Sequence, residues 1–468
     1  MIVPRQPPCP LDTPAIPRYL PPMNQLPSPK KPWLTLPWQL PAFFLALLYI
    51  TLAALATRTF LHASGGNYHG DFIHFYWAAQ ALSAHQDLYT SGQNGYIYPP
   101  LLAFLFQPLG FLSERAADLV WIFANMLLNA GSLLIAVYAI SRRLALPKSR
   151  TLFFAITLLA ALLSLDKIRA DFALGQTDAL MILSFSLILL CFDRSPILLG
   201  LAVGFGACIK YLQLIFIPYF LFRRRFAAIA YSFLAVALFS LLPAITSGWT
   251  ENLHNLHSAY AGMTHMAGVA KSSPAATEPT TAANIEGIVW GRSISLTSFF
   301  SRLDDQFHAN KKILALSVAA FCFIFILFAH ALYRAKKIPL FLRPKNDPAN
   351  SIMLCAEWAT LIILALILGP QTTSRHMVML LPTYALAAAL LLAPETSRKI
   401  NKLPLLITTL LLTLSLILPP GGAALDFWRS IAGASWCATL FALALLKTSL
   451  DYATRPETNP PALPPTNS

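Results

Sequence analysis

Charged side chains are scarce in this chain. Only 12% of its 468 residues are Asp, Glu, Lys or Arg, whereas a soluble domain usually carries about 25%. Apolar runs long enough to cross a bilayer, roughly 17–25 residues each, follow one another along most of the sequence. This pattern excludes a large soluble helical core and indicates an all-α polytopic membrane protein.

The residue patterns of several chemistries are also missing. None of the six cysteines has CxxC or other ligand-like spacing, and most lie in or beside apolar runs. The cysteines therefore form neither a disulfide framework nor a metal site. There is no DxD, HExxH, Walker loop or Gly-x-Ser-x-Gly elbow. We therefore expect no metal, no cofactor and no nucleotide site.

The net charge of +14 comes from basic residues that gather in short clusters between apolar runs. Such clusters mark the cytoplasmic ends of membrane helices, so we expect no nucleic-acid partner. The clusters are Arg142 to Arg150, Arg223 to Arg225, Arg334 to Lys345 and Arg398 to Lys402.

The charge pattern divides the chain into a membrane domain and two tails. Residues 1–37 and 448–468 are rich in proline, which predicts disordered cytoplasmic tails. Residues 38–447 form the transmembrane domain, with about 12 spans and both termini inside. The segment 65–100 and the loop 247–310 are then external.

Two stretches do not fit a simple span. Residues 99–112 are too short to cross the bilayer, which predicts a helix lying along the outer surface. A single helix over 196–222 would place Arg223 to Arg225 outside. Two short helices, separated by a break near Lys210, keep these arginines inside, as the positive-inside rule requires. Irregular backbone at membrane depth normally lines a cavity.

Asp71 is the leading candidate for catalysis. It follows Gly65, Gly66 and Gly70 and opens a predicted amphipathic helix in the first external segment. A carboxylate at the rim of a membrane protein costs free energy unless it is solvated or paired. Two roles stay open from position alone: a general base toward a hydroxyl nucleophile, or a helix N-cap.

In the predicted topology, other polar residues fall on the same outer side of the membrane. Lys210 lies deep in an apolar run and needs a partner, for which an anionic phosphate is suitable, unless the lysine snorkels to the outer surface. Arg375 and His376 follow a Gly-Pro break, and a helix start beside cations also suits a phosphate. The remaining substrate-binding candidates are His74, Tyr98, Gln176 and Arg292, with Asp178 beside Gln176 in GQTD.

At two of these positions a purely structural role is an alternative to substrate binding. His74, one turn after Asp71, is flanked by aromatic side chains and suits packing as well as substrate contact. Tyr98 precedes Pro99 and Pro100, where consecutive prolines set a rigid corner.

At these residues the chain resembles glycosyltransferase family 87, polyprenyl-phosphate-mannose-dependent mannosyltransferases of the GT-C superfamily. The motifs that carry the resemblance are GDFIHFYWAAQALSAHQDLY, YIYPPLLAFLFQPLGFL, GQTDALMIL, GLAVGFGACIKYLQLIFIPYFLFRRR, GRSISLTSFFSRL and SRHMVMLLPTYALAAALLL. One departure is Ser374-Arg375-His376, where the family usually has a Ser-Trp-containing sequence before the late histidine.

The resemblance implies a GT-C membrane fold and an inverting transfer. A hexose, by resemblance mannose, moves from a polyprenyl-phosphate donor to a glycolipid or glycan acceptor. The site would lie on the external face of a bacterial cytoplasmic membrane, among membrane lipids, with Asp71 as base by position. Two alternatives stay open: a transporter or flippase of lipid-linked sugars, and a glycan ligase or polymerase.

Overall fold

The computed structural model describes eight stretches of the chain: residues 37–62, 70–90, 96–268, 287–306, 311–340, 348–394, 400–417 and 422–454. Within these stretches the regular structure is entirely helical, as the composition predicts. The expected N-terminal tail, apart from residue 37, and residues 455–468 fall outside the described residues, as do Gly65 and Gly66. Residues 448–453 belong to α20 instead of the expected C-terminal tail.

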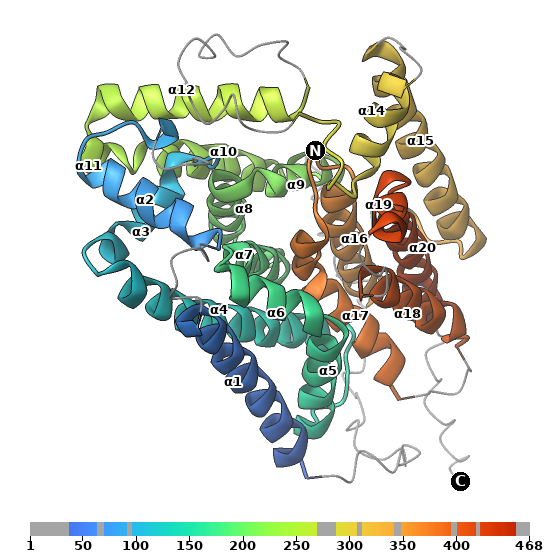
Figure 1. Ribbon diagram of the computed structural model, residues 1–468. Coiled ribbons are helices and arrows are strands. Elements are labelled where there is room, and N and C mark those ends of the chain that lie inside the picture. Colours follow the sequence, from blue (N-terminus) through green and yellow to red (C-terminus); the bar gives the residue numbers. More distant parts are fainter. Residues whose placement is uncertain are drawn as a thin grey trace, which may run out of the picture.

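Figure 1 shows the arrangement of the helices. They are α1 Gln39–His62, α2 Phe72–Ser83, α3 Pro100–Gly110, α4 Glu114–Arg143, α5 Arg150–Leu163, α6 Leu165–Leu174, α7 Asp178–Cys191, α8 Pro196–Lys210, α9 Phe216–Phe222, α10 Phe226–Leu241, α11 Ala244–Ser247, α12 Trp249–Met266, α14 Leu296–Gln306, α15 Lys311–Ala335, α16 Pro348–Ile367, α17 Leu381–Leu392, α18 Leu403–Ile417, α19 Ala423–Ser430 and α20 Gly433–Ala453. Three 3₁₀ segments join them: Leu88–Thr90, Leu212–Ile215 and Ser374–Leu380.

The described residues contain seven helices that are long and apolar enough to cross a membrane, or eight if the bent pair α5 and α6 forms one span. Five shorter apolar helices lie between them. The chain is therefore a multi-pass membrane protein. The count of about 12 crossings stays a prediction, because the short helices do not settle it by length alone.

The break predicted near Lys210 is confirmed. Helix α8 ends at Lys210, and Tyr211 takes a left-handed conformation with φ of 60°. The chain then continues as the 3₁₀ segment Leu212–Ile215 and the short helix α9. Two short pieces therefore replace a single span, as the positions of the basic residues require.

The short helix expected over 99–112 is present. Helix α3 has 11 residues and starts at Pro100, which suits the first helical position because proline has no N–H to leave unsatisfied. In Figure 1, α12 runs along the upper edge of the molecule, above α2. It exposes Trp249 and Tyr260, side chains that favour a membrane interface.

Two boundaries differ from the prediction. Residues 165–174 form α6, bent by 68° from α5. The apolar run ends at this bend with the first charged residues, Asp166 and Lys167, which pair at 2.8 Å. The last span was expected over 425–447. Instead α19 precedes a break at Ala432, and α20 continues through Ala453. Asp451 pairs there with Lys336 and Lys447, which stabilises the extra turn.

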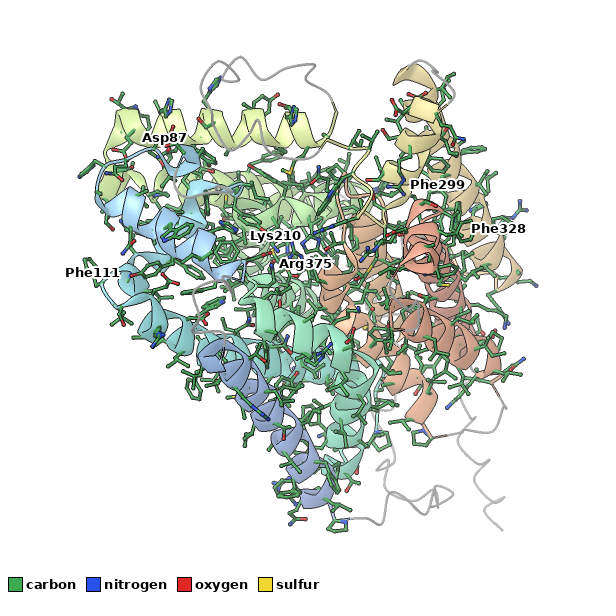
Figure 2. The ribbon with its side chains drawn as sticks, viewed as in Figure 1. Asp87, Phe111, Lys210, Phe299, Phe328 and Arg375 are labelled. Atoms are coloured by element: carbon green, nitrogen blue, oxygen red, sulfur yellow. The ribbon has the colours of Figure 1, made fainter. Side chains whose placement is uncertain are left out.

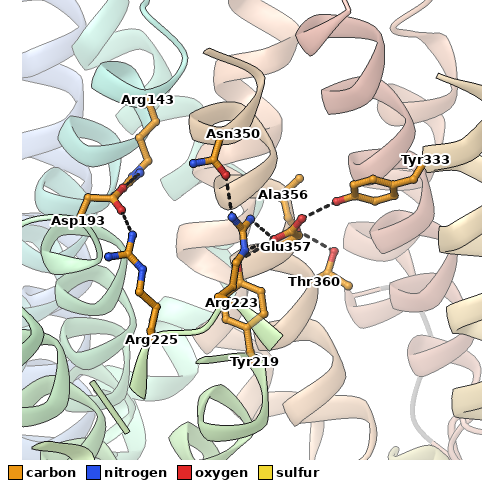
Figure 3. Close-up of polar contacts among 10 residues, drawn as sticks. All are labelled: Arg143, Asp193, Tyr219, Arg223, Arg225, Tyr333, Asn350, Ala356, Glu357 and Thr360. Carbon is orange, nitrogen blue, oxygen red and sulfur yellow. Dashed lines mark hydrogen bonds and ion pairs between the residues drawn. The ribbon is translucent and has the colours of Figure 1, made fainter. Parts of the chain in front are cut away.

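A buried polar network joins α9 to α15 and α16 (Figure 3). Glu357 on α16 forms an ion pair with Arg223, and the two side chains are only 5% and 6% exposed. Tyr219 donates to Glu357 Oε2 at 2.7 Å, and Tyr333 donates to Oε1 at 2.8 Å. Arg223 also donates to Asn350 Oδ1 at 2.7 Å. The carboxylate is thus satisfied from both oxygens, which a buried ion pair requires.

A second, more exposed ionic contact lies nearby. Asp193 binds Arg143 at 2.9 Å and also pairs with Arg225 (Figure 3). Arg223 and Arg225 therefore have structural partners, in addition to marking topology, whereas Arg224 is exposed.

Helix α15 differs from the other long helices in its surroundings. Only 6% of its most apolar 18-residue window is buried inside the protein. Phe325 and Tyr333 form its buried contacts, while Phe323, Ile324 and Phe328 are more than half exposed. Most of α15 therefore faces lipid.

The difference between the two ionic clusters leads to a stability prediction. Glu357→Ala leaves the Arg223 guanidinium buried without its carboxylate, which we expect to cost about 3–5 kcal/mol. Asp193→Ala removes a half-exposed acid and should cost about 0–1 kcal/mol. Thermal unfolding of both purified variants in one detergent measures the difference. Equal shifts in Tm would show that the buried network does not hold α9 to α16.

The predicted topology also states which side of the membrane each segment faces. A cysteine at the exposed position of Arg224 should react with a maleimide only after the membrane is permeabilised. A cysteine at Tyr260 on α12 should react from outside in intact cells. Labelling of Arg224→Cys from outside would show that the basic cluster is external and that the predicted topology is inverted there.

Candidate active site

Asp71 immediately precedes α2, but its side chain does not cap the helix. The carboxylate instead turns toward two segments that are distant in the sequence. Its Oδ2 accepts a hydrogen bond from Gln176 Nε2, and it pairs with Arg375 Nη1 at 2.8 Å. The capping alternative is therefore not what the structure shows, and the carboxylate is directed at a polar site.

Two glycines let these segments approach so closely. A Cβ on Gly70 would lie 2.8 Å from the carbonyl oxygen of Leu174, and one on Gly175 would lie 2.6 Å from Phe72 Cβ. Gly175 also has a φ of 61°, which a side chain would strain. The start of α2 thus packs against the end of α6, and Asp71 meets Gln176.

Helix α4 fixes the turn that carries Gln176. Trp121 Nε1 donates to the Gly175 carbonyl at 3.0 Å, and Asn125 Nδ2 donates to the Gln176 carbonyl at 2.9 Å. Both donors are buried, so the bonds form away from water and hold the turn strongly.

Lys210 forms a second pair beside the first. Its ammonium binds the carboxylate of Asp178, the first residue of α7, and the side chains are only 7% and 0% exposed. The ammonium also lies 5.3 Å from the centre of the Tyr98 ring, within range of a cation–π contact. The partner that the sequence requires for Lys210 is thus Asp178, and the lysine does not snorkel.

Tyr98 lies among these charges, just before α3. Burial raises the pKa of its phenol, and the nearby charge of Lys210 opposes that rise. The electrostatic fields of Asp71, Asp178 and Arg375 also reach it. Because the net shift is upward, Tyr98 stays protonated at neutral pH and offers a neutral O–H group to the site.

His376 is held in one tautomer by its own turn. The backbone N–H of Thr373 donates to His376 Nδ1 at 3.2 Å, and the two residues form a capping box. A ring nitrogen that accepts a hydrogen bond carries no proton, so the neutral ring has its proton on Nε2. His376 therefore presents an N–H donor next to the charges of Lys210, Asp178 and Arg375, which all act on it.

The two ion pairs of the site join two acidic side chains to two cationic side chains. Lys210 and Arg375 carry positive charges that offset Asp71 and Asp178. Figure 2 shows Lys210 and Arg375 side by side near the centre of the molecule, and both also act electrostatically on Asp178. The residues come from four separate segments, which the fold brings together.

Six of the eight predicted site residues meet here: Asp71, Tyr98, Gln176, Lys210, Arg375 and His376. The described contacts of His74 place it edge-on against Trp77, with ring centres 6.3 Å apart. Arg292 is exposed in the loop before α14, although its neighbour Ile294 bonds to the Thr372 carbonyl at 2.7 Å. Among the described contacts, none joins Arg292 to the six.

The sequence did not identify two buried acids. Asp178 appeared only as a polar residue beside Gln176, and its pairing with Lys210 was not foreseen. Asp171 on α6 is 1% exposed and lies near Asp178 and Asn125. An acid inside an apolar run was the available signal. Among the described residues, no group of three or more His, Cys, Asp or Glu side chains is placed to hold a metal ion.

Comparison with known proteins decides the family. The model of glycosyltransferase family 87 matches residues 96–344, more than half of the chain. The chain belongs to glycosyltransferase family 87. The matched range contains Tyr98, Gln176 and Lys210, while Asp71, Arg375 and His376 lie outside it. The family assignment confirms the resemblance drawn from the motifs and makes the protein a membrane glycosyltransferase of the GT-C class.

Two individual proteins show likeness to this member of family 87. A polyprenol-phosphate-mannose-dependent alpha-(1-2)-phosphatidylinositol mannoside mannosyltransferase of Mycobacterium tuberculosis is 33% identical over 173 residues. The match covers 35% of this chain and only 40% of that enzyme. The crystal structure of an Archaeoglobus fulgidus oligosaccharyltransferase, tethered with an acceptor peptide, has a TM-score of 0.31 at 13% identity, over 88% of this chain and 56% of that one.

The tautomer of His376 leads to a prediction for anion binding. Glutamine places an amide N–H near the position of Nε2, whereas asparagine reaches only as far as Nδ1. We expect His376→Asn to weaken binding of polyprenyl phosphate about tenfold or more, the usual loss for a hydrogen bond to a charged group. His376→Gln should keep most of the affinity. Equal losses in a direct binding measurement would show that the Nε2 proton has no part in anion binding.

Proposed function

We propose that this family 87 enzyme transfers a hexose, mannose by its resemblance, from a polyprenyl-phosphate sugar to a glycolipid or glycan acceptor. The observation that carries the proposal is the carboxylate of Asp71. It does not cap α2 and pairs with Arg375, and the charges of Asp71, Lys210 and Arg375 all reach Tyr98. A base for the acceptor and donors for a phosphate thus occur in one site.

Asp71 is the general base of the proposed reaction. Its Oδ2 takes the proton of an acceptor hydroxyl as the hydroxyl oxygen attacks the anomeric carbon. The bond between that carbon and the phosphate oxygen breaks, and the electron pair leaves with the polyprenyl phosphate. A single displacement of this kind inverts the anomeric configuration.

The charge that develops on the leaving phosphate needs fixed partners. Lys210 supplies a buried ammonium, His376 an N–H and Arg375 a guanidinium. Donors that are already in place stabilise a developing anion with no reorganisation cost, which is often the largest contribution to catalysis. Tyr98 adds a neutral hydroxyl beside Lys210, and Gln176 orients the base.

Asp178 makes this arrangement possible at membrane depth. An isolated ammonium would be costly there, so the buried carboxylate keeps Lys210 charged. Proton transfer to Asp71 and departure of the phosphate then leave the total charge of site and substrates unchanged. The reaction therefore requires no new net charge at membrane depth.

The topology predicted from the basic clusters supports a reaction on the external face of the membrane, a bacterial cytoplasmic membrane by the family resemblance. Asp71 follows α1 on the side opposite the basic clusters at Arg142 and at Arg223 to Arg225, which would face the cytoplasm. A lipid-linked donor can approach laterally through the bilayer, while a glycolipid or glycan acceptor reaches the same rim from outside.

Asp71→Asn tests the base directly. The amide keeps the shape of the side chain but cannot take the proton, so transfer should fall about 10²–10⁴-fold. Asp426→Asn, at an acid that is 76% exposed on α19, is the matched control and should keep wild-type activity. The assay uses purified protein, defined polyprenyl-phosphate sugars and membrane extract as the source of acceptor. Wild-type turnover by folded Asp71→Asn would remove the base from this mechanism.

Mass spectrometry identifies the product of the proposed reaction. A deletion strain should lack one hexose on a defined glycolipid or glycan. Expression of the wild-type chain should restore that hexose, and expression of Asp71→Asn should not. Unchanged glycolipids and glycans in the deletion strain would contradict the proposed transfer.

A further inference from the structure

The proposed base already has two partners within the protein. A single oxygen, Asp71 Oδ2, both accepts from Gln176 and pairs with Arg375. The same carboxylate must accept the proton of an incoming hydroxyl in the proposed reaction. An acceptor hydroxyl that approaches Oδ2 therefore meets Gln176 and Arg375 already bound there.

The two ion pairs of the site differ in how easily they can open. Asp71 and Arg375 have side chains that are 27% and 31% exposed, while Lys210 and Asp178 are 7% and 0% exposed. A partly solvated pair is weak, because water replaces the partners when they separate. Separating the buried pair would leave two uncompensated charges. The Arg375–Asp71 pair is therefore the exchangeable one.

Arg375 also uses its guanidinium poorly in this pair. Only Nη1 contacts the carboxylate, and the buried Nε has no acceptor among the described residues. A guanidinium binds oxyanions most strongly through two parallel N–H bonds. A phosphate that engages Nε and a terminal nitrogen would satisfy the donor that Asp71 leaves unused.

We propose that Arg375 is an exchange switch that pairs with Asp71 in the free enzyme and moves to the phosphate of the lipid donor when it binds. This inference rests on the proposed function and adds an order of events to it. Donor binding frees Asp71, which only then can accept the proton of the acceptor. The enzyme thus binds its donor first, and its base becomes available only when a sugar is present to transfer.

A double-mutant cycle on phosphate binding tests the switch. The probe is polyprenyl monophosphate in detergent micelles, and the readout is its dissociation constant. Asp71→Asn releases Arg375 and should tighten binding about two- to fivefold, the worth of a partly exposed pair. Arg375→Gln should weaken binding. In the Arg375→Gln background, Asp71→Asn should give a clearly smaller gain, because only the direct repulsion between acid and phosphate is relieved.

The control and the folding checks use the same protein. Arg169→Gln removes a 62% exposed arginine on α6 that pairs with Asp166, and it should leave the affinity unchanged. Arg375→Lys keeps the charge without the paired donors and should recover only part of the loss, which gives a second readout if Arg375→Gln folds poorly. Each variant is compared by its unfolding midpoint before binding is measured.

The outcomes separate the switch from the proposed function. If Asp71→Asn gives equal gains in both backgrounds, or if Arg375→Gln and Arg375→Lys keep wild-type affinity, Arg375 does not move and the switch is overturned, while donor binding stands. If the wild-type protein does not bind polyprenyl monophosphate at all, the switch and the proposed donor fail together.

Discussion

The fold depends on a break in one apolar run, and buried ion pairs fix both ends of that break. The chain leaves helical geometry after Lys210 and reaches the basic cluster at Arg223. Asp178 holds the first end and Glu357 holds the second. Because a separated charge in this interior would be very costly, each pair fixes the position of its backbone. The active-site lysine and the packing of α9 on α16 are therefore two results of one constraint.

Sequence reasoning predicted the break, the short α3 and the convergence on Asp71, because each depends on local composition or on the side that basic residues face. It did not find the partners of Lys210 and Arg223, since pairing joins residues that lie far apart in the chain. Arg223 has two arginine neighbours and therefore looked like a topology marker alone. The bend at α6 and the late end of α20 were also missed; at the end of α20, the partner Lys336 of Asp451 lies far away in the sequence.

Membership of family 87 and the geometry of the site bear on different questions. The family assignment establishes a membrane glycosyltransferase. The contacts around Asp71 concern how the proposed base and the neighbouring cations are arranged. Arg375 stands where the family usually has a Ser-Trp-containing sequence. In this chain the departure brings a positive charge against Asp71, which a tryptophan could not supply. We expect related chains that lack this arginine to control access to their base in a different way.

Helix α15 shows what a mostly lipid-facing element means for handling the protein. Its outer surface contacts acyl chains, and its described anchor at the far end is the hydroxyl of Tyr333 on Glu357. That carboxylate also binds Arg223. Contacts between described residues therefore join α15 to α9, in the segment that follows Lys210. A detergent that solvates α15 poorly would therefore disturb the interior through Tyr333, and also through Lys336, which pairs with Asp451 directly after α15. The choice of amphiphile during purification thus belongs to the chemistry of the enzyme.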